Sequence, residues 1–261
     1  MFKIGVFDSG LGGLTVVSAM LKHLKGIRIY YIADTLNAPY GEKTKEQIID
    51  FSTAITEYFI KNFNIDALVV ACNTATSAAI AELREKYPNL IIVGTEPGLK
   101  PAISHSKTKK VGILATPATL NGEKYKSLVS ELSKQYKVEV FEQACDGLVQ
   151  QIEKGETDTL KTISMLEHWL APMREASVDT IVLGCTHYPL VSKAIKQVMG
   201  YSVELVQTAD AISKRLLSLL EEKGHTNNGE TKLHIASTGD IKPSMVEHIL
   251  GDNIGIDRIV I

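Results

Sequence analysis

Cysteine is scarce in this chain of 261 residues, which contains only three. A small and odd number of cysteines argues against the disulfide framework that stabilises many small secreted domains. We therefore expect reduced thiols, as is typical of cytoplasmic proteins. A chain of this length can bury an apolar core large enough to stabilise its fold without such crosslinks.

Long apolar runs and an excess of charge of one sign are also missing. Polar residues interrupt every apolar stretch well before about 18 positions, and the first residues lack the apolar segment and cleavage site of a secretion signal. Neither membrane insertion nor secretion is expected. The formal net charge is −2 and the Lys and Arg residues are scattered, so no surface for nucleic acid is expected either.

Short runs rich in β-branched residues alternate with amphipathic segments along the whole chain. This alternation predicts βα units with mainly parallel sheets, and the continuous apolar character of the runs predicts strands covered on both faces. The predicted strands span residues 3–7, 28–33, 67–71, 90–93, 110–115, 138–141, 180–184, 203–206, 232–236 and 258–260. The predicted helices span residues 14–24, 44–63, 76–87, 120–135, 159–174, 190–199, 209–222 and 242–250.

The sequence contains an approximate internal repeat. "KIGVFDSG" at residues 3–10 resembles "KVGILATP" at 110–117, and "DALVVACNTATSAAIAEL" at 66–83 resembles "DTIVLGCTHYPLVSKAIK" at 179–196. The repeat predicts two pseudo-symmetric three-layer α/β domains with the active site in the cleft between them. The segment "EPGLKP", with its two prolines Pro97 and Pro101, marks the expected junction, so residues 1–96 with 208–261 form the first domain and residues 97–207 the second.

Two of the three cysteines, Cys72 and Cys185, occupy equivalent places in this repeat. Each follows a predicted strand and precedes a predicted helix, so each lies at the carboxyl edge of a parallel sheet, where ligands bind. A helix N-terminus at that place favours the thiolate form. One such cysteine alone would be equally consistent with core packing. The matched pair, each followed by polar residues, favours a reactive role.

Three kinds of chemistry suit a pair of thiols. Zinc binding is disfavoured because the chain has no local C-x-x-C pair. Nucleophilic catalysis would use Cys185 with His187 but would leave Cys72 unexplained. In the third possibility, one thiolate removes a proton from a tetrahedral carbon and the other thiol returns a proton to the opposite face, which inverts the centre without a cofactor.

The glycine-rich turn after the first predicted strand, "FDSGLGG", resembles the start of a dinucleotide-binding fingerprint. The third glycine of that fingerprint is replaced by Thr15, while Asp34 stands near the place of a ribose-binding acid. Asp34 is equally consistent with a capping role. The Asp8 carboxylate would repel a pyrophosphate but would suit an ammonium group, so the turn is better interpreted as one wall of an amino-acid site.

Four segments carry a resemblance to a known family: "VFDSGLGGLTV", "YIADTLNAPYG", "VVACNTATS" and "VLGCTHYPL". They resemble, in order and across nearly the whole chain, the hallmark segments of glutamate racemases in the cofactor-independent aspartate/glutamate racemase superfamily. The resemblance implies interconversion of L- and D-glutamate without cofactor or metal. It also implies a supply of D-glutamate for peptidoglycan synthesis and a cytoplasmic homodimer.

The resemblance further implies roles for individual residues. Cys72 and Cys185 would be the two acid/base groups, assisted by Asp8, His187 and Glu153. The substrate-binding residues would be Asp8, Ser9, Pro39, Tyr40, Gly41, Asn73, Thr74, Thr116, Thr119, Thr186 and His187.

Several alternatives remain open at this point. The chain is also consistent with a racemase of aspartate or another amino acid, with a nucleotide-dependent enzyme that uses the glycine-rich turn, and with a non-catalytic amino-acid-binding protein. Tyr40 is also consistent with loop packing, and Glu153, in the charged stretch "EKGETD", with a solvated position. Cys145 lacks an evident counterpart in the repeat and is interpreted as structural.

Overall fold

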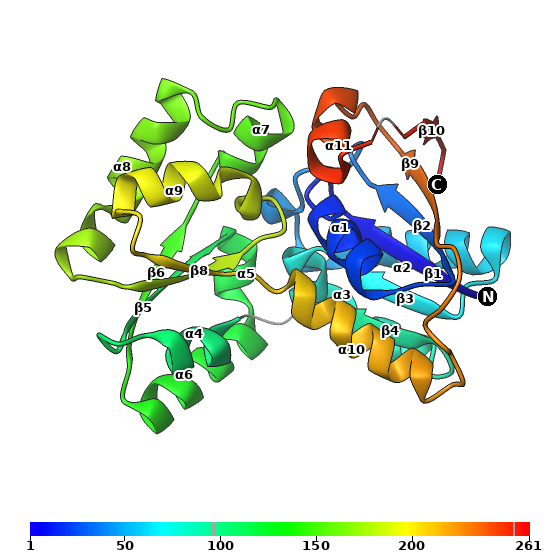
Figure 1. The fold of residues 1–261 in the computed structure, drawn as a ribbon, viewed down its shortest axis with the longest axis horizontal. Helices are drawn as coiled ribbons and strands as arrows, with labels where there is room; N and C mark the ends of the chain where they lie inside the picture. The colour runs from blue at the N-terminus through cyan, green and yellow to red at the C-terminus, as the bar shows by residue number, and fades with distance from the viewer. Residues whose placement is uncertain (96–97, 253) are drawn as a thin grey trace. The chain divides into compact units, whose positions relative to one another are not determined.

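The computed structural model describes residues 1–95, 98–252 and 254–261. The chain divides into two compact units (Figure 1). Unit 1 comprises Met1–Thr95 with Ala209–Ile261, and unit 2 comprises Glu96–Thr208. Pro97, at which the junction is expected, lies outside the described residues.

Unit 1 is built on a sheet to which the described residues contribute six strands, and every pairing in it is parallel. The strand order is β10-β9-β2-β1-β3-β4. The strands are β1 (Phe2–Asp8), β2 (Ile27–Ala33), β3 (Ala67–Val70), β4 (Ile91–Gly94), β9 (Lys232–Ser237) and β10 (Ile256–Arg258).

Helices cover both faces of this sheet. On one face α1 packs against α10 and α11, and on the other α2 packs against α3 (Figure 1). The helices are α1 (Leu14–His23), the 3-10 turn η1 (Tyr40–Glu42), α2 (Lys45–Phe63), α3 (Asn73–Lys86), α10 (Ala209–Glu221) and α11 (Pro243–Leu250). Helix α2 has a sharp beginning because Thr44 and Gln47 form a capping box. It ends at Phe63, and Asn64 caps it in the left-handed conformation with φ 49°.

Unit 2 has a parallel sheet of four described strands in the order β6-β5-β7-β8. These strands are β5 (Lys110–Ala115), β6 (Glu139–Ala144), β7 (Thr180–Gly184) and β8 (Glu204–Val206). Helices α4 and α6 pack on one another, as do α8 and α9. The helices are α4 (Leu99–His105), α5 (Pro117–Asn121), α6 (Glu123–Tyr136), α7 (Leu148–Glu153), α8 (Leu160–Glu175), the 3-10 turn η2 (Tyr188–Val191) and α9 (Ser192–Met199).

The two units share one topology. The order β2-β1-β3-β4 in unit 1 corresponds strand for strand to β6-β5-β7-β8 in unit 2. Matched aspartates precede the third strand of each: Asp66 accepts the backbone N–H of Lys3 at 2.8 Å, and Asp179 accepts those of Lys107 and Thr108 at 2.7 and 2.9 Å. The α/β class with parallel sheets is confirmed, and β9 and β10 extend the sheet of unit 1 beyond the repeated part.

The secondary structure corrects several predicted boundaries. The single helix expected over residues 120–135 is two helices, α5 and α6, because Gly122 adopts an extended conformation between them (ψ 133°). The helix expected from residue 76 already begins at Asn73. The last strand lies at Ile256–Arg258 rather than at 258–260, and helices α4 and α7 were not predicted.

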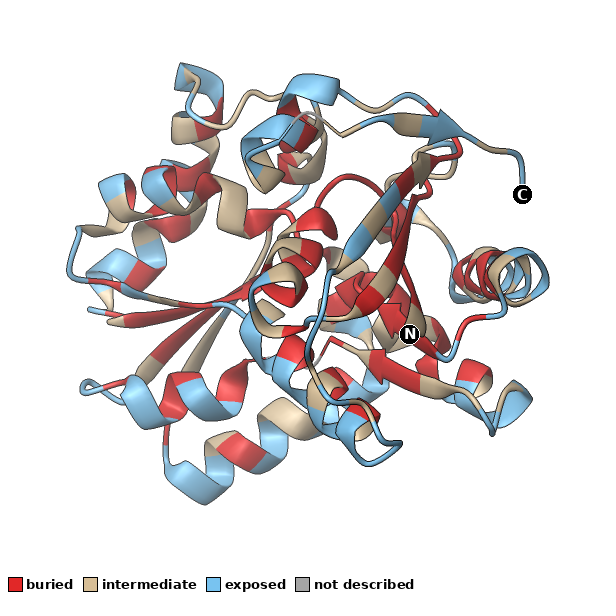
Figure 2. Cartoon of the chain, turned by 45° about the vertical axis from the view of Figure 1, so that its right-hand side comes forward, coloured by how far each residue is buried: buried red, intermediate tan, exposed pale blue. Residues whose placement is uncertain are grey.

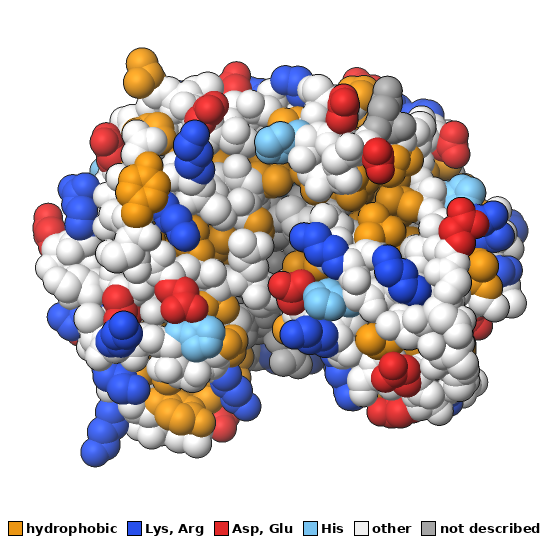
Figure 3. Space-filling view, in the orientation of Figure 1, with side chains coloured by type: hydrophobic (Ala, Val, Ile, Leu, Met, Phe, Trp, Pro, Cys, Tyr) orange, Lys and Arg blue, Asp and Glu red, His pale blue; other side chains and the backbone are white. Residues whose placement is uncertain are grey.

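Burial follows this architecture. The central strands are largely buried and the outward faces of the helices are exposed (Figure 2). On the face drawn in Figure 3, Lys and Arg side chains are interspersed with Asp and Glu. No helix among the described residues is long and apolar enough to span a bilayer.

Candidate active site

The carboxyl ends of the first and third strands lie side by side in each unit. Phe7 in β1 pairs with Val70 in β3, and Ala115 in β5 pairs with Gly184 in β7. In a parallel sheet of this strand order, the chain leaves these two strands in opposite directions, and the resulting crevice is where ligands bind. Cys72 follows β3 and Cys185 follows β7, so each thiol occupies the ligand-binding edge of its own sheet.

Cys72 forms the centre of the first half-site, by which we mean the predicted site residues of unit 1. It is 5% exposed and caps the N-terminus of α3, where its Sγ accepts the backbone N–H of Ala75 at 3.5 Å. Its thiol also faces the Ser9 Oγ at 3.8 Å. Asn73 and Thr74 are buried in the first turn of α3. The helix N-terminus expected at Cys72 is therefore present, and it favours a negative charge on the sulfur.

Asp8, the last residue of β1, is fully buried at the glycine-rich turn. Its Oδ2 accepts the backbone N–H groups of Gly13 at 2.9 Å and of Gly10 at 3.3 Å. Gly13 is required by this close approach, since a Cβ there would lie 2.6 Å from the Asp8 Cβ and 2.8 Å from the Tyr31 hydroxyl. Gly10 and Gly13 of "FDSGLGG" thus donate their N–H groups to the Asp8 carboxylate. A bound phosphate would not have this negatively charged neighbour.

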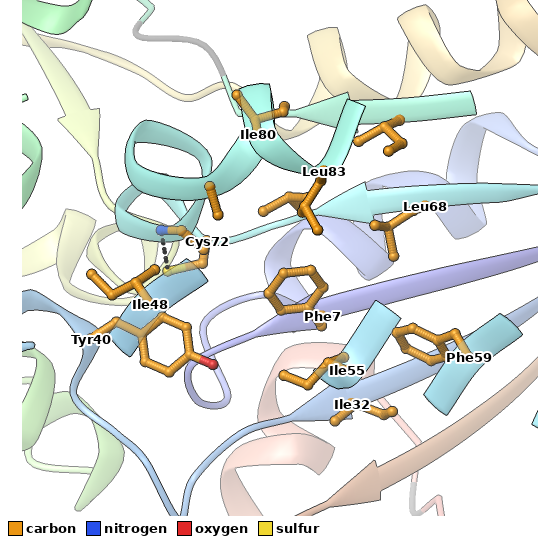
Figure 4. Close-up of a cluster of buried hydrophobic side chains, with 14 of the residues drawn as sticks. Phe7, Ile32, Tyr40, Ile48, Ile55, Phe59, Leu68, Cys72, Ile80 and Leu83 are labelled. Atoms are coloured by element: carbon orange, nitrogen blue, oxygen red, sulfur yellow. Dashed lines mark hydrogen bonds between the residues drawn. The ribbon is translucent and has the colours of Figure 1, made fainter. Parts of the chain in front are cut away.

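Tyr40 lies in η1, between the N-cap Pro39 and Gly41, and its side chain is 1% exposed. Its hydroxyl donates to Asp34 Oδ2 at 2.6 Å. Burial and the neighbouring Asp34 charge raise the pKa of Tyr40 well above its ordinary value. Tyr40 and Cys72 belong to one apolar cluster, and Figure 4 shows both at the same end of it, beside Ile48. Tyr40 therefore combines packing with a specific polar contact.

The second half-site, the predicted site residues of unit 2, is built around Cys185 and His187. The Cys185 Sγ lies 3.7 Å from His187 Nδ1, and His187 Nε2 lies 2.6 Å from Glu153 Oε1. Cys185 does not precede an α-helix directly, which corrects the expectation from the repeat. A 3-10 turn, η2, intervenes before α9. The His187 imidazole therefore lies beside the Cys185 thiol, at the place where an α-helix N-terminus was expected.

Glu153 is the last residue of α7 and its side chain is 21% exposed, whereas that of His187 is 2% exposed. The contact with His187 excludes a purely solvated position for Glu153. Burial by itself would lower the pKa of His187, but the hydrogen bonds and charges of Cys185 and Glu153 outweigh burial and raise that pKa well above its ordinary value. The protonated imidazole is favoured between the two groups.

Three threonines complete the predicted residues of unit 2. Thr116 follows β5 and caps α5, where its Oγ1 accepts the backbone N–H of Thr119 at 3.3 Å. The two hydroxyls lie 3.0 Å apart. Thr186, next to Cys185, is buried. By topology Thr116 corresponds to Ser9 of unit 1, so each half-site places a hydroxyl beside its thiol-bearing strand.

The structure also assigns places to residues that the sequence left unexplained. Cys145 follows β6 and its N–H donates to the Ala115 carbonyl at 3.0 Å, just as the Asp34 N–H after β2 donates to that of Asp8 at 2.9 Å. Cys145 thus occupies the position that Asp34 has in unit 1, and no cysteine of the first repeat corresponds to it. It is 3% exposed, and burial raises its pKa. Within the described residues, no group of three or more His, Cys, Asp or Glu side chains is arranged to hold a metal ion.

Comparison with known proteins gives concordant matches. Residues 4–216 match the family described as Asp/Glu/Hydantoin racemase. The chain is 60% identical over 248 residues to the glutamate racemase of Aliarcobacter butzleri (strain RM4018), with 95% of each chain covered.

Solved structures are similar as well. The glutamate racemase isoform RacE1 from Bacillus anthracis has a TM-score of 0.86 and 35% identity, with 99% of this chain and 97% of that chain covered. The glutamate racemase from Francisella tularensis subsp. tularensis SCHU S4, solved in complex with D-glutamate, has a TM-score of 0.82 and 28% identity, with the same coverage.

Proposed function

Because this chain belongs to the Asp/Glu/Hydantoin racemase family, we propose that it is a glutamate racemase that interconverts L- and D-glutamate without a cofactor. The observation that carries the proposal is the matched position of two thiols: Cys72 and Cys185 follow the third strand of two units with the same strand order. The relatives named glutamate racemase, one of them bound to D-glutamate, support the choice of substrate.

The proposed reaction uses the two thiols on opposite faces of the α-carbon. One cysteine, as thiolate, takes the α-hydrogen as a proton and becomes a thiol, which leaves a carbanion-like centre. The other cysteine, as thiol, gives its proton to the opposite face and becomes a thiolate. In the reverse direction the two residues exchange roles. This proposal requires both half-sites to act on one substrate molecule.

The groups around each thiol suit these roles. At Cys72, the N-terminus of α3 stabilises the thiolate and offers N–H donors for a substrate carboxylate, together with the hydroxyl of Ser9. At Cys185, His187 can hold the proton that the thiol gives or takes, and Glu153 stabilises the protonated imidazole. Asp8 supplies the negative charge that the substrate ammonium needs.

The chemical difficulty is the weak acidity of the α-hydrogen. Without a cofactor, the carbanion-like transition state depends on oriented donors and on exclusion of water. The buried state of Cys72, Cys185 and the side chains next to them supports such an environment. We further propose that the residues implied by the family resemblance, including Thr74, Thr116, Thr119 and Thr186, contact the substrate.

Three further proposals rest on the family resemblance. The product D-glutamate would serve peptidoglycan synthesis, the protein would act in the cytoplasm, and it would form a homodimer. Size-exclusion chromatography with light scattering tests the last of these, and a monomer at micromolar concentration would contradict it.

Proton NMR in D2O tests the proposed reaction directly. With purified protein and no added cofactor, deuterium should replace the α-hydrogen of both L- and D-glutamate, and circular dichroism should show decay of the optical signal from either enantiomer. Aspartate in a parallel sample tests the other substrate. Binding of glutamate without any exchange by the folded protein would contradict a racemase and would favour a binding protein.

Variants of the three cysteines provide matched controls. Cys72→Ser and Cys185→Ser should each lower racemisation by at least about 100-fold, because each removes one of two proton-transfer groups. The remaining thiol should still exchange the α-hydrogen of one enantiomer. Cys145→Ser, the third cysteine, should retain activity. Equal losses in all three variants would argue against a specific role for Cys72 and Cys185.

A further inference from the structure

Asp34 is a buried carboxylate whose two oxygens are both occupied by protein donors. Its side chain is 1% exposed. Oδ1 accepts the Thr238 hydroxyl at 2.7 Å, and Oδ2 accepts the Tyr40 hydroxyl at 2.6 Å. The Asn37 side-chain amide donates to both oxygens, at 3.1 and 3.0 Å. A carboxylate with this set of donors is suited to hold other side chains in place.

Thr238 reaches Asp34 from a remote part of the sequence. It follows β9, and its backbone N–H donates to the Ala33 carbonyl at 3.0 Å, which continues the β2–β9 pairing. Its hydroxyl oxygen also accepts the backbone N–H of Leu36 at 3.1 Å. Next to it, the N–H of Gly239 donates to the Thr35 hydroxyl at 2.9 Å. We call these contacts of Thr238 and Gly239 with residues 33–36 the β9 clasp.

Tyr40 depends on Asp34 for its position. Its ring is buried among the apolar residues of α2 and α3, and a buried hydroxyl needs a hydrogen-bond partner. Asp34 supplies that partner, and Thr238 fixes the carboxylate from the opposite oxygen. The chain of contacts therefore runs from Thr238 through Asp34 to Tyr40, which lies at the Cys72 end of the cluster in Figure 4.

We infer that Thr238 is a positioning residue that acts through Asp34 to hold Tyr40 and the Pro39–Gly41 turn in the conformation that binds substrate. Asp34 itself is a positioning residue in this scheme, since its oxygens are engaged by Thr238, Asn37 and Tyr40. The inference rests on the proposed function, because it takes the Tyr40 turn as part of the substrate site. Its new element is the coupling of this turn to β9, in the sequence after unit 2.

The kinetic test compares Thr238→Val with Thr238→Ser and Thr35→Val. Thr238→Val removes a hydrogen bond to a buried carboxylate and should raise KM for both enantiomers about tenfold, with a smaller change in kcat. Thr238→Ser keeps the hydroxyl and should stay within about twofold of the parent. Thr35→Val removes a hydrogen bond of the same clasp without touching Asp34 and should also leave KM within about twofold.

This pattern separates positioning from a merely structural role. A variant that had only lost stability would lower kcat in proportion to the inactive fraction and would leave KM unchanged. The double variant Thr238→Val with Tyr40→Phe should bind substrate no more weakly than Tyr40→Phe alone, because both changes break the same chain of contacts. Equal KM values for Thr238→Val and Thr35→Val, or additive effects in the double variant, would overturn the inference.

A second measurement does not depend on catalysis. Protein labelled with 3-fluorotyrosine has nine tyrosine signals in 19F NMR, and the Tyr40→Phe variant identifies the signal of Tyr40. Thr238→Val should shift or broaden that signal, whereas Thr35→Val should leave it in place. An unchanged Tyr40 signal in Thr238→Val would contradict the positioning role. If the parent protein showed no exchange of glutamate, the proposed function would fail while this structural coupling could still be judged.

Discussion

His187 and Glu153 form a short ion pair at the edge of the unit 2 sheet. His187 Nε2 lies 2.6 Å from Glu153 Oε1, and the His187 side chain is almost completely buried. Because the carboxylate takes up Nε2, the other ring nitrogen, Nδ1, is the one that faces Cys185. The pair thereby determines which ring nitrogen meets the thiol, and Glu153 adds to the effect of Cys185 in raising the pKa of the imidazole.

The first prediction concerns the pH dependence of stability. The native pKa of His187 lies above its unfolded value of about 6.5, so the native state holds this proton more tightly. The resulting stabilisation is complete below about pH 6.5 and is lost as pH rises through the native pKa. Glu153→Gln removes one of the causes of the shift and should weaken this pH dependence. Urea unfolding across neutral and mildly alkaline pH measures it.

Glu131→Gln, on the exposed side of α6, is the matched control for that experiment. It removes a carboxylate of the same kind without approaching His187 and should follow the parent curve. Parallel stability curves for the parent and Glu153→Gln over the same range would show that the ion pair does not govern the titration of His187.

The second prediction concerns Gly13. Gly13→Ala should reduce the free energy of unfolding by about 1–3 kcal/mol, because the new Cβ has no room between Asp8 and Tyr31. Racemisation should fall as well, since Asp8 is displaced. Gly255→Ala, where nothing lies within 4 Å of the added Cβ, is the control. Thermal or urea unfolding compares the two, and similar stabilities would refute the steric argument.

The third prediction concerns Asp179, which precedes β7 and accepts hydrogen bonds from the residues that follow α4. Burial raises its pKa, but hydrogen bonds from Ser106, Thr108 and Lys107 outweigh burial and lower it below the ordinary value. Its stabilising effect is therefore present above about pH 3.9 and is lost as pH falls through the native pKa. Asp179→Asn should destabilise the protein by about 1 kcal/mol at neutral pH, since solvent screens this partly exposed group.

For Asp179, the pH series is the discriminating measurement. The difference in unfolding free energy between the parent and Asp179→Asn should shrink as pH drops below about 3.9. Asp50→Asn, at an exposed position of α2, should match the parent throughout. If the difference in unfolding free energy stayed constant at all pH values, the charge of the Asp179 carboxylate would not be the source of its stabilising effect.

The fourth prediction concerns the reactivity of Cys145. Burial raises the pKa of this thiol, so little thiolate is present and access is poor. The Cys72→Ser/Cys185→Ser double variant carries Cys145 alone, and iodoacetamide should modify it slowly in the native protein but rapidly in urea. Intact-protein mass spectrometry follows the reaction. Rapid native modification would place Cys145 among the accessible thiols.

The fold class was predictable because it depends on local patterns that the chain repeats. The apolar runs before Cys72 and Cys185 are buried strands, and their position in the repeat indicates the sheet edge where each thiol lies. Helix α4 was missed because Pro101 suggested a boundary, whereas a proline in the first turn of a helix costs no internal hydrogen bond. Helix α7 is too short, at six residues, to show a helical period.

The contacts that organise the site were less predictable, because they join residues far apart in the sequence. Thr238 lies 204 positions from Asp34, and no spacing rule links a threonine after one strand to an aspartate after another. Family resemblance suggested an assisting role for Glu153, but its contact with His187 was not predicted, since "EKGETD" looks like a solvated stretch. The catalytic and binding roles of the residues remain predictions that the variants above test.

The connectivity of unit 1 has a consequence for biosynthesis. A ribosome makes β1 to β4 first, then all of unit 2, and only afterwards the segment that contributes β9, β10 and the β9 clasp. Until that segment emerges, β2 presents an unpaired edge and Asp34 lacks the hydroxyl of Thr238. Unit 2, being continuous, can complete its sheet earlier. Both thiols are therefore synthesised before the β9 clasp can form, and a chain interrupted after unit 2 would carry both thiols on an incomplete scaffold.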